Sequence, residues 1–305
     1  MWLIYGFLSA ALLGLYDVCK KHSLKENAVI PVLFLNTLFC SLIFVPLVVG
    51  SAMGVLPDNV LFYIPVEGWE VQRYIVLKAL IVLSSWLCAY FGMKHLPLTL
   101  VGPINATRPV LVLVGAILVY GEHLNLLQWA GVAMAVVSFF MLSRSGKREG
   151  IDFRHNRWVL CVVLGALLGA VSGLYDKYLL ADESSGGVGL NRMVVQSYYN
   201  FYQCGMMALM MLLIWYPTRR RTTAFCWNWA IPLISIFLSV ADFVYFYALS
   251  LDGAMVSVVS LARRSSVVVS FLIGAFIFRE KNLRNKAIDL LLVLLGMLLL
   301  YFGTK

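Results

Sequence analysis

Charged side chains are scarce in this chain, because Asp, Glu, Lys and Arg together make up only 13% of its 305 residues. Hydrophobic residues make up 61%, and the mean hydropathy of +0.86 is far from that of soluble domains. This composition excludes the water-soluble two-domain protein that the length alone would suggest. The net charge of +9 could favour nucleic acid, but no RNA- or DNA-binding module is recognisable, so no nucleic-acid partner is expected.

Histidine is also rare, and none of the four histidines has the spacing of a metal ligand within an apolar run. The sequence lacks a GxSxG pattern and any other catalytic constellation inside its apolar runs. We therefore expect no enzyme, no metal and no cofactor. The six cysteines follow no disulfide framework, and four are interpreted as reduced core residues: Cys40, Cys88, Cys161 and Cys204.

Long apolar runs, in contrast, fill most of the chain. Each is about 20 residues long, which is enough to cross a hydrocarbon core of about 30 Å. The first run lacks a preceding basic stretch, so it is interpreted as a mature span and not as a signal peptide. We predict ten transmembrane helices at 2–19, 29–50, 74–95, 97–120, 126–143, 158–180, 194–216, 229–250, 254–278 and 287–303.

One twelve-residue pattern occurs twice. GFLSAALLGLYD, from Gly6 to Asp17, returns as GALLGAVSGLYD, from Gly165 to Asp176, at an offset of 159 residues and with seven identities. Both copies carry a small residue at every fourth position, which on a helix forms a stripe that a neighbouring helix can approach closely. We therefore predict a duplicated protein whose two halves meet through these helices.

The number of spans in each half determines how the halves are related. Five spans are an odd number, so the halves should enter the membrane in opposite directions, as in the inverted repeats of secondary transporters. The expected fold is thus an all-α integral membrane protein of two inverted five-helix repeats. The repeats are expected at 1–143 and 158–305, joined by a basic loop at 144–157.

A proline and glutamate pattern follows the third span. Pro97 precedes Pro109 by twelve residues, and Glu122 follows thirteen later in YGEHLNLLQWAG. The run from 92 to 131 thereby resembles the repeat of the EamA-like branch of the drug/metabolite transporter superfamily. The second half keeps a glutamate, Glu280 in FREKNL, but lacks both prolines. The resemblance implies a monomeric multi-pass carrier that works by alternating access, and it leaves the substrate open.

Lysine and arginine outside the predicted spans are divided unequally between the two faces. One face holds three, Arg73, Arg192 and Lys305. The other face holds sixteen: Lys20, Lys21, Lys25, Lys94, Arg144, Lys147, Arg148, Arg154, Arg157, Arg219, Arg220, Arg221, Arg279, Lys281, Arg284 and Lys286. The positive-inside rule places the face with sixteen cations in the cytoplasm, so both termini are expected on the outer side of the plasma (cytoplasmic) membrane. The EamA-like family is usually described with both termini inside. We follow the charges in this prediction.

Arg108 and Asp242 lie near the middle of their predicted spans, where a charge needs a partner or a wet cavity. Asp242 can neutralise Arg263, the counterpart of Arg108, or the adjacent Arg264, whereas Arg108 has no such local partner. An unpaired guanidinium suits an anionic substrate group. The alternative is that Arg108 pairs with an aspartate of the duplicated motif or with backbone carbonyls.

The duplicated motif supplies two further carboxylates, Asp17 and Asp176, with Tyr16 and Tyr175 beside them. These aspartates could bind protons or coupling cations, or they could pair with neighbouring lysines. Uncharged polar residues complete the candidate substrate site, and their alternative role is polar contact between helices. They are Asn105 and, on one helical face, Gln196, Asn200 and Gln203.

Four other charges receive structural interpretations. Lys78, one turn into its span, is expected to extend its ammonium to the membrane interface. Asp289 is placed in the first turn of the last span, where the helix dipole favours an acid. Glu122 and Glu280 are expected to cap the helices that follow them.

The expected function is therefore secondary transport of a small metabolite, with an anionic group as the ligand of Arg108. The alternative is a flippase of the same fold for a lipid or lipid headgroup, since a lipid phosphate would suit Arg108 and Arg263 equally well. A flippase needs a side opening between helices, whereas a solute carrier needs a central cavity. The expected partners are a small-molecule substrate and the lipid bilayer, and the expected assembly is a monomer.

Overall fold

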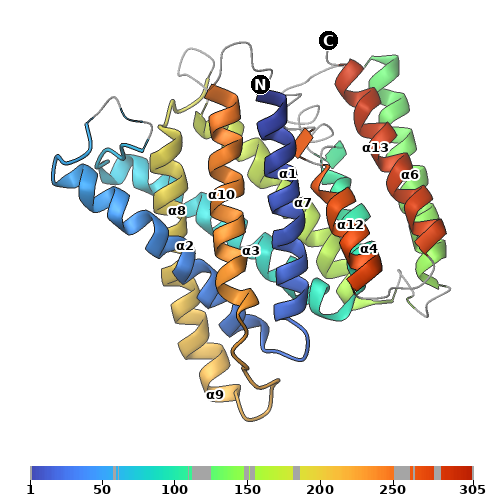
Figure 1. Cartoon of the computed structure of the whole chain (residues 1–305), viewed down its shortest axis with the longest axis horizontal. Helices are drawn as coiled ribbons and strands as arrows, with labels where there is room; N and C mark the ends of the chain where they lie inside the picture. The colour runs from blue at the N-terminus through green and yellow to red at the C-terminus, as the bar shows by residue number, and fades with distance from the viewer. Residues whose placement is uncertain are drawn as a thin grey trace.

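The computed structural model describes residues 2–57, 60, 62–108, 110–111, 125–147, 151, 155–180, 186–250, 262–263, 265–277 and 283–303. Every regular element within these ranges is a helix, which confirms the all-α class (Figure 1). The helices are α1 (Trp2–Ser23), α2 (Val29–Ala52), α3 (Trp69–His95), α4 (Leu98–Ala106), α6 (Leu126–Lys147), α7 (Arg157–Leu180), α8 (Arg192–Met210), η2 (Met211–Trp215), α9 (Tyr216–Thr218), α10 (Ala230–Ser250), α12 (Ser266–Ile277) and α13 (Leu283–Gly303).

Four of these helices, α2, α3, α7 and α13, are long and apolar enough to cross a membrane. Shorter apolar helical stretches cover Leu126–Leu142, Ala230–Tyr245 and Ser266–Ile277. These helices fit a multi-pass helical membrane protein. Parts of the fourth and ninth predicted spans, together with Pro109, Glu122 and Glu280, lie outside the described residues, so the number of ten spans and the two caps stay predictions.

The two helices that carry the duplicated motif pack in a reciprocal way. α1 contacts α10 and α12 from the second half of the chain, and α7 contacts α3 and α4 from the first half (Figure 1). Hydrogen bonds fix both contacts: Ser9 Oγ donates to the Ala241 carbonyl and Ser85 Oγ donates to the Gly165 carbonyl, each at 2.7 Å. The contact between the halves that the small-residue stripes predict is thus present.

Close approach explains why the stripe of α1 contains glycine. A Cβ added to Gly14 would lie 2.5 Å from Cβ of Val269 on α12, well inside van der Waals contact. Two further helix pairs join the two halves of the chain: α2 packs against α8, and α6 packs against α13.

Large apolar side chains face outward on many helices. Phe7 on α1, Leu213 on η2, Trp229 before α10 and Phe276 on α12 are all more than half exposed. A soluble monomer rarely exposes apolar side chains over so many elements. This surface suits contact with lipid, while the polar and charged groups described below lie inside the bundle.

Candidate functional site

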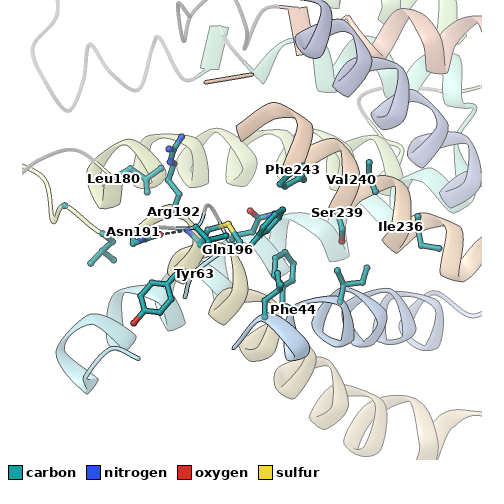
Figure 2. Close-up of a pocket in the computed structure, with 17 residues that line it drawn as sticks. Phe44, Tyr63, Leu180, Asn191, Arg192, Gln196, Ile236, Ser239, Val240 and Phe243 are labelled. Carbon is teal, nitrogen blue, oxygen red and sulfur yellow. Dashed lines mark hydrogen bonds between the residues drawn. The ribbon is translucent and has the colours of Figure 1, made fainter. Parts of the chain in front are cut away.

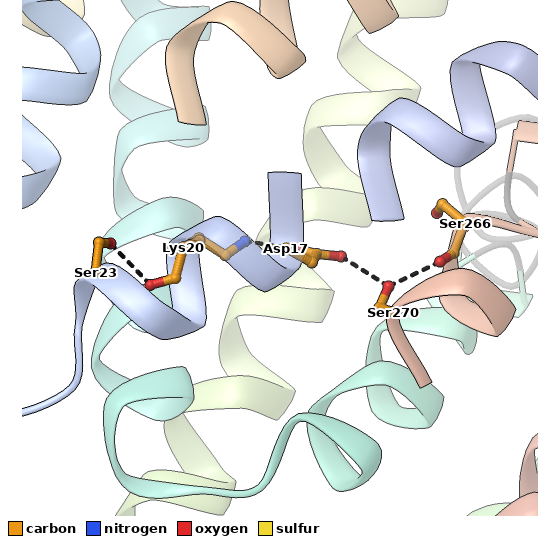
Figure 3. A network of polar contacts seen from close by, with 5 residues as sticks. All are labelled: Asp17, Lys20, Ser23, Ser266 and Ser270. Carbon is orange, nitrogen blue, oxygen red and sulfur yellow. Dashed lines mark hydrogen bonds and ion pairs between the residues drawn. The ribbon is translucent and has the colours of Figure 1, made fainter. Parts of the chain in front are cut away.

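Asp17 lies in the lower part of α1 and is held by two partners. Its Oδ1 forms an ion pair with Nζ of Lys20 at 2.8 Å, and its Oδ2 accepts a hydrogen bond from Ser270 Oγ at 3.4 Å (Figure 3). Ser270 lies on α12, so this carboxylate connects helices from both halves. The Lys20 ammonium also lies 4.2 Å from the centroid of the Tyr16 ring. The structure thus shows Asp17 and Tyr16 in a lysine-centred cluster.

Lys78 does not reach the membrane interface, so that prediction was wrong. The residue is only 6% exposed, and its ammonium forms an ion pair with Asp176. Lys78 belongs to α3 and Asp176 to α7, and the packing of these helices against each other brings the two charges together. Tyr175, next to Asp176, donates a hydrogen bond to the Tyr74 carbonyl of α3 at 3.3 Å.

Asp242 on α10 forms an ion pair with Arg263. The guanidinium carbon of Arg263 also lies 4.3 Å from the centroid of the Tyr245 ring on the same helix as Asp242. The second half of the chain therefore neutralises its own partly buried arginine. Arg264, the other expected partner, lies outside the described residues.

Arg108 follows α4 and differs from these cations. Within the part of the chain that the structure describes, no ion pair or hydrogen bond holds its guanidinium, and its Nε is buried without a partner. The side chain lies against α7, where a Cβ added to Gly169 would be 2.8 Å from Cζ of Arg108. Gly169 belongs to the duplicated stripe, so the missing side chain provides the space that the guanidinium fills.

Asn105 lies three residues before Arg108, at the end of α4, so the two residues share one face of this short helical segment. Its Oδ1 is buried and has no partner among the described residues. The negative charge of Asp17 attracts the Arg108 guanidinium without contact, but the Asp17 carboxylate is itself bound to Lys20 and Ser270. Arg108 and Asn105 therefore present unsatisfied donor and acceptor groups in the interior of the bundle.

The polar face of α8 is buried, and its three residues have different roles. Asn200 packs against α2, where Ser41 Oγ donates a hydrogen bond to the backbone carbonyl of Asn200 at 3.0 Å. Both amide atoms of the fully buried Gln203 lack a partner within the described residues. Gln196 lines a pocket. The interpretation as pocket wall fits Gln196, whereas the side-chain amide of Asn200 donates to the Gln196 carbonyl of its own helix at 2.8 Å.

This pocket has a volume of about 620 Å³ and lies between α2, α8 and α10 (Figure 2). Aromatic side chains form part of its wall, and the rings of Phe62 and Phe243 stack with centroids 5.0 Å apart. Arg108 and Asn105 do not belong to its lining. The polar residues in its lining are Asn191, Arg192, Gln196, Ser239 and Tyr63.

Sequence reasoning missed several residues of the interior. Tyr90 on α3 has a buried hydroxyl without a partner among the described residues, and the Lys20 ammonium lies 5.3 Å from its ring centroid. Ser235 on α10 donates to the Asn36 side chain at 2.9 Å. Single tyrosines and serines within apolar runs give no periodic signal, so neither residue could be selected from the sequence.

Asp289 also corrects a prediction. α13 begins at Leu283, so Asp289 lies beyond the first turn, where the helix dipole has little effect. It is only 1% exposed, and both carboxylate oxygens lack a partner among the described residues.

The structure thus combines a bundle of apolar helices with partly buried ion pairs and a pocket between helices, which is compatible with a transport protein in a membrane. Residues 1–144 match the EamA-like transporter family, which confirms the resemblance seen in the sequence. The family is described as one of transporters. The match supports a membrane transporter of the drug/metabolite type.

Two further comparisons agree with this class. A curated relative from Sinorhizobium sp., described as an uncharacterized transporter in cobO 3'region, is 25% identical over 142 residues, which cover 47% of this chain and 96% of the relative. A solved crystal structure, described only as a protein, aligns over 97% of this chain and 95% of its own at 16% identity. Its TM-score of 0.59 supports a shared fold and carries no information on function.

Proposed function

We propose that this protein is a secondary transporter that carries a small anionic metabolite across the plasma membrane. The observation that carries this proposal is the contrast between Arg108 and three other cations of the bundle. Lys20, Lys78 and Arg263 each have a carboxylate partner, whereas the Arg108 guanidinium has none among the described residues. The missing negative charge is the group that a substrate would supply.

The energetics favour such a ligand. A buried ion without a partner costs several kcal/mol, even after the protein relaxes. A carboxylate or phosphate can accept two parallel hydrogen bonds from a guanidinium, and such charge-assisted bonds are among the strongest in proteins. Asn105 would add an acceptor for a hydroxyl or amino group of the same molecule, because its Oδ1 has no partner within the described residues. Together the two side chains suit a metabolite with one acidic and one neutral polar group.

Alternating access between two inverted repeats is the mechanism that we propose. The repeats are residues 1–143 and 158–305, and the reciprocal packing of α1 on α10 and α12, and of α7 on α3 and α4, supports this arrangement. Arg108 lies against α7, so a movement of one repeat against the other would change the side from which its guanidinium can be reached. The protein would act as a monomer without a cofactor.

The pocket between α2, α8 and α10 supports a route to this site from one face. Arg192 at its rim precedes the buried Gln196 by one helical turn of α8 (Figure 2). The unequal division of lysine and arginine supports an orientation in which this face, and both termini, lie outside the cell. The pocket would then be an outer vestibule.

Binding to the purified protein tests the substrate class. The thermal unfolding temperature of the wild type would be measured against a panel of soluble carboxylates, phosphates, cations and neutral solutes. We expect some anions to stabilise the wild type and Arg108→Ala to lose this response. Arg73→Ala is the matched control, since it removes an exposed arginine that pairs with Glu70 and should keep the response.

Three outcomes would contradict the proposal. Stabilisation by cations or neutral solutes alone would rule out an anionic substrate. A response of Arg108→Ala equal to that of the wild type would show that Arg108 has a structural role. Stabilisation only by phospholipids, with no response to soluble anions, would favour a flippase of the same fold. Arg108→Lys adds a finer check, because a point charge cannot reproduce a bidentate contact and should restore only part of the response.

A further inference from the structure

α13 carries two buried charged residues on one face, Lys286 and Asp289. Lys286 is fully buried and Asp289 is 1% exposed. Their spacing of three residues makes them neighbours on the helix surface. α13 packs against α6 and α4, so both side chains lie inside the bundle.

The carboxyl group of Asp289 has no partner among the described residues. Neither side-chain oxygen receives a hydrogen bond or an ion pair, although its backbone carbonyl accepts a hydrogen bond from Ser138 Oγ of α6 at 2.7 Å. α4 carries no titratable side chain, and α6 carries charge only in its last turn, at Arg144 and Lys147. On α13 itself the nearest charged residue is Lys286, while Arg284 lies at the helix start.

Lys286 is bonded elsewhere in this conformation. Its Nζ donates a hydrogen bond to Thr99 Oγ1 at 3.0 Å. Thr99 lies in the first turn of α4, the helix that leads to Asn105 and Arg108. The lysine therefore connects α13 to the helix that carries the proposed substrate contacts.

We propose that Asp289 is a proton-binding site whose carboxyl group carries a proton in this conformation. An ionised carboxylate without a partner in a low-dielectric interior costs several kcal/mol, whereas a neutral acid avoids most of that cost. When the proton leaves, it passes to water and Asp289 becomes a carboxylate one helical turn from Lys286. The two charges then attract each other strongly, and the Lys286 ammonium is drawn from Thr99 to Asp289.

This exchange would couple the proton to α4. With Asp289 protonated, Lys286 holds Thr99; with Asp289 ionised, α4 loses that bond. An anion bound at Arg108 could also change the position of α4. By linkage, anion binding would then change the proton affinity of Asp289 by the same factor by which protonation of Asp289 changes the anion affinity. This coupling step rests on the proposed function, but the proton site itself does not.

Infrared spectroscopy of the purified full-length protein in lipid nanodiscs tests the site without a substrate. We expect a carbonyl band of a protonated, buried carboxyl group at mildly acidic pH, with a shift in heavy water. Asp289→Asn should remove this band. Asp242→Asn is the matched control and should retain it, because the Asp242 carboxylate is paired with Arg263. Persistence of the band in Asp289→Asn, or no band in the wild type, would overturn the proposal.

A second variant tests the role of Lys286 in a protein that keeps Asp289. Thr99→Val removes one acceptor of the Lys286 ammonium and so shifts the balance toward contact with the Asp289 carboxylate. A positive charge at this distance should lower the pH at which the band disappears by about 1–3 units. An unchanged midpoint would overturn the exchange. Because neither measurement uses a substrate, failure here is independent of any failure of Arg108 to bind an anion.

Discussion

Gly169→Ala tests the placement of Arg108 without touching the arginine itself. The new Cβ would lie 2.8 Å from Cζ of Arg108 and 3.0 Å from both Nε and Nη1. Because carbon atoms pack at about 3.5–4.0 Å, the guanidinium must move by roughly 0.7 Å or more. The backbone of α7 can stay in place, since the neighbour that must yield is the end of a long side chain.

The expected effect is a loss of affinity without a loss of stability. Hydrogen bonds to charged groups contribute about 1.5–3 kcal/mol, and every 1.4 kcal/mol is a factor of ten, so misaligning one of two such bonds weakens anion binding about tenfold to a hundredfold. Alanine in place of glycine within a helix contributes about 1 kcal/mol, which offsets the cost of moving the arginine. The thermal unfolding temperature without ligand should therefore change little.

The assay is titration of the purified variant with the anion that stabilises the wild type most. Gly205→Ala on α8 is the matched control, because an added Cβ there meets no described atom within 4 Å. Its affinity should equal that of the wild type. Unchanged affinity in Gly169→Ala would refute the assignment of Arg108 as the substrate contact, since the guanidinium cannot keep its position beside the new methyl group.

Three further predictions concern stability and orientation. Gly14→Ala should destabilise the protein by about 1–3 kcal/mol in denaturant titrations, because the added methyl group meets Val269 on α12. This side chain is β-branched and stiff, so it cannot move aside as the long Arg108 side chain can. Unaltered stability would show that the α1–α12 contact is loose. Asp242→Ala should lower stability by up to about 3 kcal/mol by leaving Arg263 unpaired, and a double variant that also replaces Arg263 with Met should recover part of it. A reporter that fluoresces only in the cytoplasm, fused after Lys305, should stay dark; bright cells would place the C-terminus inside.

The sequence predicted the close helix contacts but not the partners. The small residues repeated around Gly14 and Gly169 indicated a closely packed face on each helix. Only the structure shows that the first meets Val269 of α12 and that the second meets the side chain of Arg108. Periodicity within one helix shows which face is packed, but not which helix covers it.

The buried charges show the same limit. The pair of Asp242 and Arg263 could be expected, because both residues lie near the middle of their spans in the same half. Lys78 was expected at the interface because its partner Asp176 is 98 residues away and becomes a neighbour only through the packing of α3 on α7. Asp289 was expected in a first turn because the start of α13, at Leu283, lies four residues earlier than the predicted span.

The buried lysines have a consequence for biogenesis. Lys20 and Lys286 belong to the sixteen cations that support the proposed orientation, yet in the folded protein both are buried and bonded, to Asp17 and Thr99. Helices insert into a bilayer before they pack against one another, so the insertion machinery meets both lysines while their charges are still exposed. Substituting either lysine should therefore disturb two stages separately: the direction in which the nascent chain enters the membrane, and later the assembly of the inserted helices.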